Sequence, residues 1–147
     1  MGQYALQVLR YWGYRRVIAT ASQAQHATLV KYGAIKCFDY RSPNVVKNIL
    51  SWSASSNELG PSIPFILDCI GSKDGTLAPE AKLAVKGTRV AIMLPVIVKH
   101  ASTGEPEYSL EAQGEADWAK GVIVRGVRTH FYLQVSFHSV QTQSGKD

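Results

Sequence analysis

A short segment near the start of the chain carries the residue types best suited to hold a phosphate group. It consists of Ser22, Gln23, Ala24 and Gln25, directly after an apolar run at residues 17–21. In a dinucleotide-binding fold the second strand usually ends in Asp or Glu when the ligand is NAD, because that carboxylate binds the ribose 2′-hydroxyl. No acid stands here. A carboxylate would repel a 2′-phosphate, whereas a serine hydroxyl and neutral amides can donate to it, so the segment favours NADP over NAD if it binds either.

A structural role is predicted for the same segment. Ser22 and Gln25 have the spacing of a capping box, in which two side chains each accept a hydrogen bond from a backbone N–H at the start of a helix. The two roles are compatible, because a phosphate at a helix N-terminus uses the same backbone N–H groups. Both interpretations therefore stay open.

Motifs for other kinds of catalysis are missing from the sequence. No Cys-x-x-Cys or His-x-x-x-His pair is present, and the four histidines are spread along the chain, so we expect no metal site. The G-x-S-x-G nucleophile elbow and the full phosphate-loop pattern are absent as well. The glutamates between residues 105 and 115 could include an acid/base pair, but a solvated loop is the better interpretation. Cys37 and Cys69 are predicted to be small buried hydrophobes rather than nucleophiles.

The elements that must position these residues alternate between helices and short apolar strands. Helices are predicted at residues 3–12, 23–32, 42–52 and 76–86, and strands at residues 17–21, 37–39, 65–69, 89–94 and 121–127. The first four strands begin about 20, 28 and 24 residues apart, which leaves room for a crossover helix each time. Strands without polar alternation suit a sheet that helices cover on both faces. The sequence therefore predicts a doubly wound parallel α/β sheet.

The helix at residues 3–12 is amphipathic. Ala5, Val8, Leu9 and Trp12 share one face at the three-four spacing, and we expect that face to be buried. Residues 54–64 and 101–117 are predicted to be loops, the second with at most a short helix. The Ser- and Gln-rich residues 135–147 show no periodicity and are predicted to form an irregular tail.

Composition places the chain among globular proteins. It has 147 residues, of which 46% are hydrophobic and 18% charged, about one domain's worth. Sixteen Lys and Arg against eleven Asp and Glu give a net charge of +5, but no block of about five or six like charges occurs. We therefore expect a solvated surface with at most one small anionic ligand, and no nucleic acid. No stretch is long and apolar enough for a membrane span, and two cysteines cannot form a disulfide framework, which favours the cytoplasm.

Five short motifs in register resemble the cofactor-binding domain of medium-chain dehydrogenase/reductases. In chain order they are GQYALQ at 2–7, VIATAS at 17–22, KYGA at 31–34, FDYR at 38–41 and LDCIG at 67–71, and the strand at 90–95 continues the pattern. The resemblance covers residues 2–134. It is strongest to the zinc-free branch of fungal enoyl reductase-like proteins, which includes trans-acting reductases of polyketide pathways. We therefore divide the chain into a partial dinucleotide-binding domain at residues 1–134 and a tail at residues 135–147.

The resemblance implies an oxidoreductase that uses NADP(H) to transfer hydride to an activated double bond or carbonyl. The substrate is then a small molecule of the enoyl, carbonyl or quinone type. Residues of this chain that match the family's cofactor contacts are Gly2 (phosphate turn), Ser22, Gln23, Ala24 and Gln25 (2′-phosphate loop), Tyr40 (adenosine phosphate side), and Met93 and Leu94 (nicotinamide ribose side). No catalytic residue is assigned. As alternatives, Tyr40 is a half-buried aromatic at a strand end, and Met93 and Leu94 are ordinary core.

The chain also departs from the family pattern. Compared with the family, we expect this chain to lack the N-terminal catalytic lobe and, because the match begins inside the glycine-rich turn, to lack the first and central strand as well. We expect a truncated Rossmann-like sheet in which the strands at residues 17 and 65 are separated or pair directly. The isolated chain is then expected to be inactive.

Two other functions are weighed against the reductase. One is a non-catalytic remnant or binding module that docks to a partner. The other, a Rossmann-like methyltransferase, needs an acidic residue and glycines after its first strand, and that stretch is not present. A homo-oligomer is compatible with the sequence.

Overall fold

The computed structural model describes residues 1–54 and 63–128. It consists of two compact units, Met1–Ile63 and Pro64–Asp147. Most of the loop predicted at residues 54–64, and all of the tail predicted at residues 135–147, lie outside the described residues. No helix in the described ranges is long and apolar enough to cross a bilayer.

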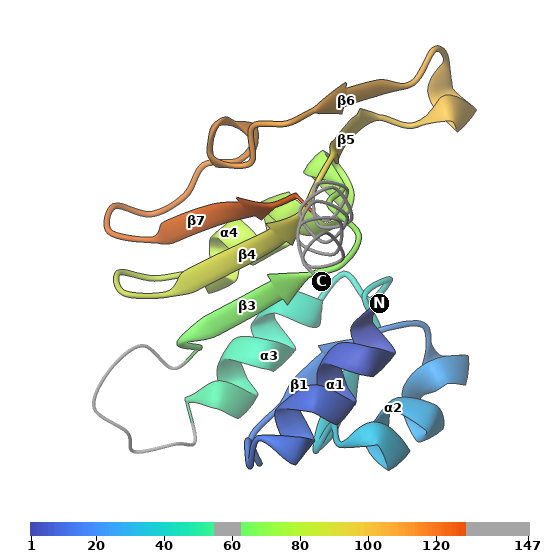
Figure 1. Ribbon diagram of the computed structural model, residues 1–147, viewed down its shortest axis with the longest axis vertical. Helices are drawn as coiled ribbons and strands as arrows, with labels where there is room; N and C mark the ends of the chain where they lie inside the picture. Colours follow the sequence, from blue (N-terminus) through green and yellow to red (C-terminus); the bar gives the residue numbers. More distant parts are fainter. Residues whose placement is uncertain (55–62, 129–147) are drawn as a thin grey trace, which may run out of the picture. The chain divides into compact units, whose positions relative to one another are not determined.

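The first unit alternates helices with two short parallel strands (Figure 1). In chain order it contains α1 (Gly2–Tyr11), β1 (Ile18–Thr20), the 3-10 turn η1 (Gln23–Gln25), α2 (His26–Tyr32), β2 (Lys36–Phe38) and α3 (Val45–Ser53). Ile18 lies opposite Lys36 in the β1–β2 ladder, and Thr20 lies opposite Phe38. Each predicted helix and strand of this unit is therefore present, with α3 starting three residues later than predicted.

The first helix buries a different stripe from the predicted one. Leu6 is buried and packs with Leu29 and Ala34 into the core of this unit, whereas Val8 and Trp12 are 44% and 68% exposed. The prediction for Val8 and Trp12 is therefore wrong. Because α1 packs on α2 through Leu6, the buried stripe runs through positions 2, 5, 6 and 9, one step around the helix.

Gly13 follows the end of α1 and turns the chain. Its φ of +89° lies in the left-handed region, and the N–H of Tyr14 donates to the carbonyl of Leu9 at 3.0 Å. This is the Schellman arrangement, in which a left-handed glycine lets the chain turn back on the helix end. The turn directs the chain into β1.

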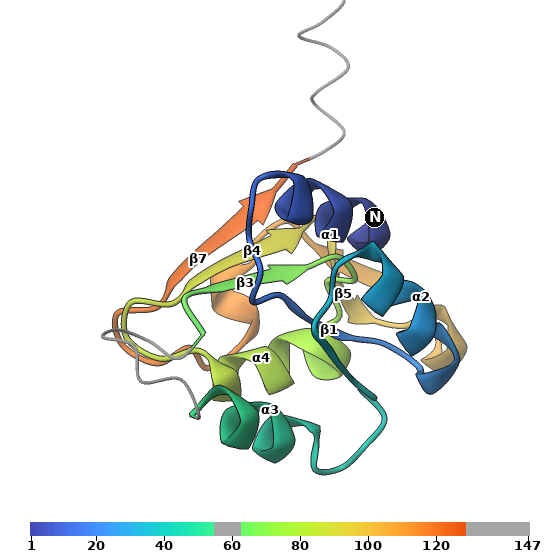
Figure 2. The same cartoon turned by 90° about the horizontal axis from the view of Figure 1, so that it is seen from below.

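The second unit holds a three-stranded parallel sheet in the order β3–β4–β7 (Figure 1). Its helices and strands are β3 (Phe65–Asp68), the π-turn η2 (Lys73–Leu77), α4 (Ala78–Leu83), β4 (Arg89–Met93), β5 (Val96–Lys99), η3 (Ala101–Thr103), β6 (Glu107–Ser109), η4 (Gln113–Glu115) and β7 (Ile123–Val127). Figure 2 shows α4 along one face of this sheet. The central strand is the most buried, with Val90 and Ile92 at 1% and 0% exposure in one core with Leu77.

Two predictions in this unit are wrong in part. The region predicted as a loop at residues 101–117 contains β6, which pairs antiparallel with β5. The helix predicted at residues 76–86 starts earlier, at η2, and α4 ends at Leu83 because Ala84 is already extended. The early start follows from Ser72, whose hydroxyl accepts a hydrogen bond from the Gly75 N–H.

Parallel pairing throughout β1–β2 and β3–β4–β7 confirms the predicted α/β fold class. Within the described ranges, β1 and β3 belong to different sheets. The direct pairing that was one of the two expectations is therefore not found among the described residues.

Candidate functional site

The loops after β1 and β2 lie at one edge of the first unit's sheet. Parallel strands end at the same edge, which is where open α/β sheets bind ligands. The N–H of Ala21 donates to the carbonyl of Phe38 at 3.0 Å, so the pairing continues past the end of β1. The segment at residues 22–25 therefore starts beside the turn that carries Tyr40. We refer to this edge as the β1–β2 edge.

Ser22 does not form the predicted capping box. Its backbone is extended and its side chain makes no capping hydrogen bond; the N–H of Gln25 donates instead to the backbone carbonyl of Ser22 at 2.9 Å. The capping prediction is wrong because the segment begins as a 3-10 turn, which uses the backbone carbonyl as its acceptor. The half-buried Ser22 hydroxyl is thus not used to cap, while Gln23, Ala24 and Gln25 are exposed.

Tyr40 stands on the turn that follows β2 and is 52% exposed. The Arg41 Nε donates to the Tyr40 hydroxyl at 3.2 Å, and its guanidinium carbon lies 5.3 Å from the ring centroid. The backbone N–H of Arg41 donates to Asp39 Oδ1 at 3.0 Å, which fixes the turn. A planar guanidinium is therefore held over an aromatic ring at the β1–β2 edge, a geometry suited to phosphate.

Arg41 is a candidate residue that the sequence reasoning missed. It belongs to the FDYR motif, but only Tyr40 was given a role. A signal was present, because Arg binds phosphate with two parallel donors and stacks on aromatic rings, and Arg41 directly follows Tyr40 in the sequence.

Below the edge, α2 is tied to both strands. A ring nitrogen of His26, Nε2, lies 3.1 Å from the carbonyl of Ala21, and the Cys37 thiol donates to the carbonyl of His26 over 3.8 Å. Burial raises the pKa of the Cys37 thiol, so it stays protonated at neutral pH. Cys37 therefore holds structure rather than acting as a nucleophile.

Gly2 opens α1. No side chain caps this end of the helix, and the N–H groups of Tyr4 and Ala5 both donate to the carbonyl of Met1. With Gly2, six of the eight residues predicted to contact the cofactor lie in the first unit, which spans Met1–Ile63. They are Gly2, Ser22, Gln23, Ala24, Gln25 and Tyr40.

The remaining two, Met93 and Leu94, belong to the second unit at the end of β4. The Leu94 side chain is 7% exposed and belongs to the core, as the alternative interpretation predicts. A Cβ built on Gly126 would lie 2.6 Å from Leu94 Cδ1, so the Leu94 side chain would have to shift to admit any larger residue there. A Cβ on Gly71 would lie 2.7 Å from the carbonyl oxygen of Met93, and the φ of Gly71 is +64°. The backbones after β3 and β4 therefore approach closely.

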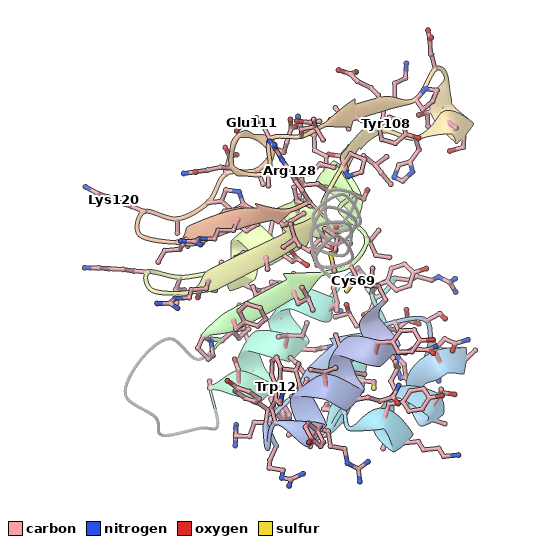
Figure 3. The ribbon with its side chains drawn as sticks, viewed as in Figure 1. Trp12, Cys69, Tyr108, Glu111, Lys120 and Arg128 are labelled. Carbon is pink, nitrogen blue, oxygen red and sulfur yellow. The ribbon has the colours of Figure 1, made fainter. Side chains whose placement is uncertain are left out.

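A hollow of about 180 Å³ adjoins Leu94. Its lining includes Glu111 and Arg128, both labelled in Figure 3, and Gly126. Small-molecule sites usually enclose about 300–1,000 Å³. This hollow is therefore too small to hold a substrate by itself.

Buried polar groups gather where β3 ends. Asp68 is 3% exposed; its Oδ1 accepts from the Ile70 N–H at 2.8 Å and its Oδ2 from the Thr76 hydroxyl at 2.5 Å. Burial, with a further contribution from Asp68, raises the pKa of Glu80 to about 9. At neutral pH the Glu80 carboxyl is thus protonated, and Asp68 holds the turn that leads into η2. Sequence reasoning did not single out either acid.

Comparison with known proteins adds three findings. No protein-family model matches the chain. The trans-enoyl reductase mpsG of Macrophomina phaseolina (strain MS6) is 30% identical over 127 residues, which are 86% of this chain and 31% of the relative. The trans-enoyl reductase mycC of Thermothelomyces thermophilus is 38% identical over 71 residues, 48% of this chain and 17% of the relative. The chain thus spans about a third or less of the length of these relatives.

Solved structures share the fold over almost the whole chain. The CurK enoyl reductase aligns with a TM-score of 0.60 and 13% identity, over 97% of this chain and 40% of that one. A putative alcohol dehydrogenase from Thermotoga maritima aligns with a TM-score of 0.62 and 18% identity, over 99% of this chain and 35% of that one. Both alignments define the class of the fold, a parallel α/β domain of the Rossmann type.

The relatives narrow that class to a family. They carry the names that the sequence motifs at residues 2–71 led us to expect, and the longest match covers residues of both units. Together, the relatives and the shared fold support the medium-chain dehydrogenase/reductase superfamily for this chain. The resemblance inferred from the sequence is confirmed.

Proposed function

We propose that this chain is the cofactor-binding part of an NADPH-dependent reductase, and that its β1–β2 edge holds the 2′-phosphate of NADP. One observation carries the proposal. A Ser22 hydroxyl that does not cap its helix and an Arg41 guanidinium stacked on Tyr40 follow the ends of two paired parallel strands. Both groups donate hydrogen bonds, and a phosphate accepts them.

The electrostatics of this edge suit a dianion better than a hydroxyl. The end of β1 carries no acid, and the nearby Asp39 carboxylate already accepts the Arg41 N–H. An acid at the end of the second strand would select NAD by binding the 2′-hydroxyl. Its replacement by Ser22 and the presence of Arg41 support a preference for NADP.

The proposed reaction is the reduction of an enoyl, carbonyl or quinone-type small molecule. Relatives of this chain are named trans-enoyl reductases, and one similar structure is named a quinone oxidoreductase. Nicotinamide, when bound, supplies the hydride. This chain's residues bind and orient the adenosine end, and Met93 and Leu94 are proposed to lie on the nicotinamide ribose side. Because Leu94 Cδ1 packs at Gly126, a contact from Leu94 would come from its backbone.

We expect reduction of a substrate, as opposed to binding of the cofactor, to require residues beyond those that the structure describes. The chain spans 31% of the length of mpsG. We therefore expect the chain assayed alone to bind NADP and to show no robust oxidation of NADPH with enoyl thioesters or quinones. Free cysteines at positions 37 and 69 support a cytoplasmic setting.

Substitution of Ser22 tests the phosphate assignment. Ser22→Asp places a carboxylate where the 2′-phosphate is proposed to bind, and a charge pair at ~4 Å near a protein surface is worth about 4 kcal/mol before screening. We expect the affinity for NADP, measured by isothermal titration, to fall at least about tenfold, with the affinity for NAD unchanged or higher.

A matched control adds the same charge elsewhere. Asn48 is exposed on α3 and is not among the residues proposed to hold the 2′-phosphate, so Asn48→Asp is expected to change the affinity for NADP less than about twofold. If both variants weaken NADP equally, or if Ser22→Asp leaves NADP binding intact, the assignment is wrong.

A further inference from the structure

The net charge of the chain is concentrated in its first unit. Residues 1–63 contain seven Lys and Arg against two Asp and Glu, whereas residues 64–147 contain nine of each. The whole excess of +5 therefore lies in the first unit. The proposed NADP edge uses one of these seven cations, Arg41, and the other six lie outside the set of residues proposed to bind NADP.

Three of the remaining cations line one hollow. It measures about 380 Å³, and its lining residues, which define the basic hollow, are Gln7, Arg10, Tyr11, Arg15, Lys31 and Tyr32. Tyr11 and Tyr32 are the last residues of α1 and α2, and Arg15 lies in the turn before β1. The basic hollow thus lies near the residues that precede β1 and β2, whereas the β1–β2 edge is formed by the residues that follow these two strands. The two sites are at opposite ends of β1 and β2.

Arg10 is held rigidly at this hollow. Its Nη1 donates to the carbonyl of Lys31 at 3.1 Å, which joins the ends of α1 and α2. Its side chain also passes 3.1 Å from where a Cβ on Gly33 would stand, so glycine makes room for it. A guanidinium fixed by one of its five donors has others that can face a ligand.

The described part of the first unit offers these cations little internal compensation. Among residues 1–54, Asp39 is the one carboxylate side chain, and it accepts the backbone N–H of Arg41. The ion pair found in the described ranges, between Lys73 and Glu115, belongs to the second unit. Cations that converge without a carboxylate attract an anion from solution.

We propose that the basic hollow binds a small molecule that carries phosphate groups, at a second site separate from the NADP edge. Its volume falls within the range of about 300–1,000 Å³ usual for small-molecule sites, and the cations converge on a concavity rather than forming a stripe. Two guanidinium groups and one ammonium pair well with phosphate oxygens, and the Tyr11 and Tyr32 hydroxyls add donors. These features favour a compact polyanion over an extended acidic peptide.

Inorganic pyrophosphate is the probe. The ¹⁵N-labelled chain is titrated at low ionic strength in the presence of saturating NADP, and amide shifts are followed. We expect the largest shifts at Arg15, Lys31 and Tyr32. The double substitution Arg15→Gln and Lys31→Gln is expected to weaken pyrophosphate binding about tenfold. Both residues are exposed, so the variant is expected to keep its amide spectrum and thermal midpoint.

The matched control removes two charges outside the hollow. Lys47→Gln with Lys120→Gln is expected to change the affinity less than about twofold, because both lysines are exposed and neither lines the hollow. Equal weakening by both double variants would mean general attraction to a basic chain and would overturn the proposal. So would an absence of binding, or shifts centred on Ser22 and Tyr40.

The two proposals fail separately. Ser22→Asp is expected to leave pyrophosphate binding at the basic hollow unchanged. If NADP does not bind, the proposed function fails while shifts at Lys31 still support the second site. If NADP binds and pyrophosphate does not, the second site alone is wrong.

Discussion

The two units of this chain share an alternation of strands and helices but differ in how deeply their strands are buried. In the second unit β4 lies between β3 and β7, and its Val90 and Ile92 side chains are almost completely buried. In the first unit β1 and β2 have three residues each and only one neighbour each within the described ranges. A strand flanked on both sides builds a dense core, whereas a two-stranded sheet does not.

The two units also differ in net charge. The second unit has equal numbers of acidic and basic residues, and the pKa of its half-buried Glu80 is raised to about 9. The first carries the whole positive excess and the two candidate anion sites. Under the two proposals above, the first unit binds anionic ligands, whereas the second unit supplies the larger packed core, and the predictions below test this contrast.

The largest expected effect is a pH dependence confined to the second unit. The pKa of Glu80 is about 9 in the folded chain and near 4.5 when unfolded, so between these values the folded state binds more protons. Stability is therefore highest below about pH 4.5 as far as this group is concerned, and falls as the pH rises towards 9. From pH 5 to pH 8 we expect a loss on the order of 2–4 kcal/mol.

Glu80→Gln is the control for this effect. The amide stays neutral, so the variant is expected to lose most of the pH dependence and to be more stable than the parent chain at pH 8. Urea unfolding followed through the amide signals of Ile92 and Leu29 separates the second unit from the first. A stability that stays level or increases from pH 5 to pH 8 would contradict the account.

A smaller effect is expected from overpacking the second unit. Gly126→Ala places a Cβ 2.6 Å from Leu94 Cδ1, and Leu94 is buried, so the core must shift at a cost of about 1–3 kcal/mol. Gly114→Ala, where no atom lies within 4 Å of the added Cβ, is expected to change stability by less than about 0.5 kcal/mol. Equal effects in urea unfolding at Ile92 would show that the Leu94 contact does not matter.

The five strands that pair in parallel could be predicted from the sequence because they are short apolar runs bounded by turn residues. The apolar run of β5, Val96–Lys99, was not assigned to a strand. β6 could not be predicted, since Glu107, Tyr108 and Ser109 carry no apolar pattern and pair only because β5 lies opposite. The buried stripe of α1 was displaced by its contact with α2, which is a tertiary effect. Such contacts are invisible to periodicity within one helix.

The candidate site was predictable to a similar extent. The segment at residues 22–25 stood out by the absence of an acid, and the structure places it beside the turn of Tyr40. Its capping role was wrong, because a backbone carbonyl replaced the Ser22 side chain as acceptor. The raised pKa of Glu80 depends on burial beside Asp68, twelve residues away along the chain, which no local pattern reveals.

The most direct test of the account is a paired titration of the ¹⁵N-labelled chain with NADP and with NAD. We expect NADP to bind at least about tenfold more tightly, with the amides of Ser22, Gln25, Tyr40 and Arg41 shifting for NADP and much less for NAD. Equal affinities for the two dinucleotides, or NADP-induced shifts that leave these four amides unmoved, would contradict the assignment of the β1–β2 edge to the 2′-phosphate.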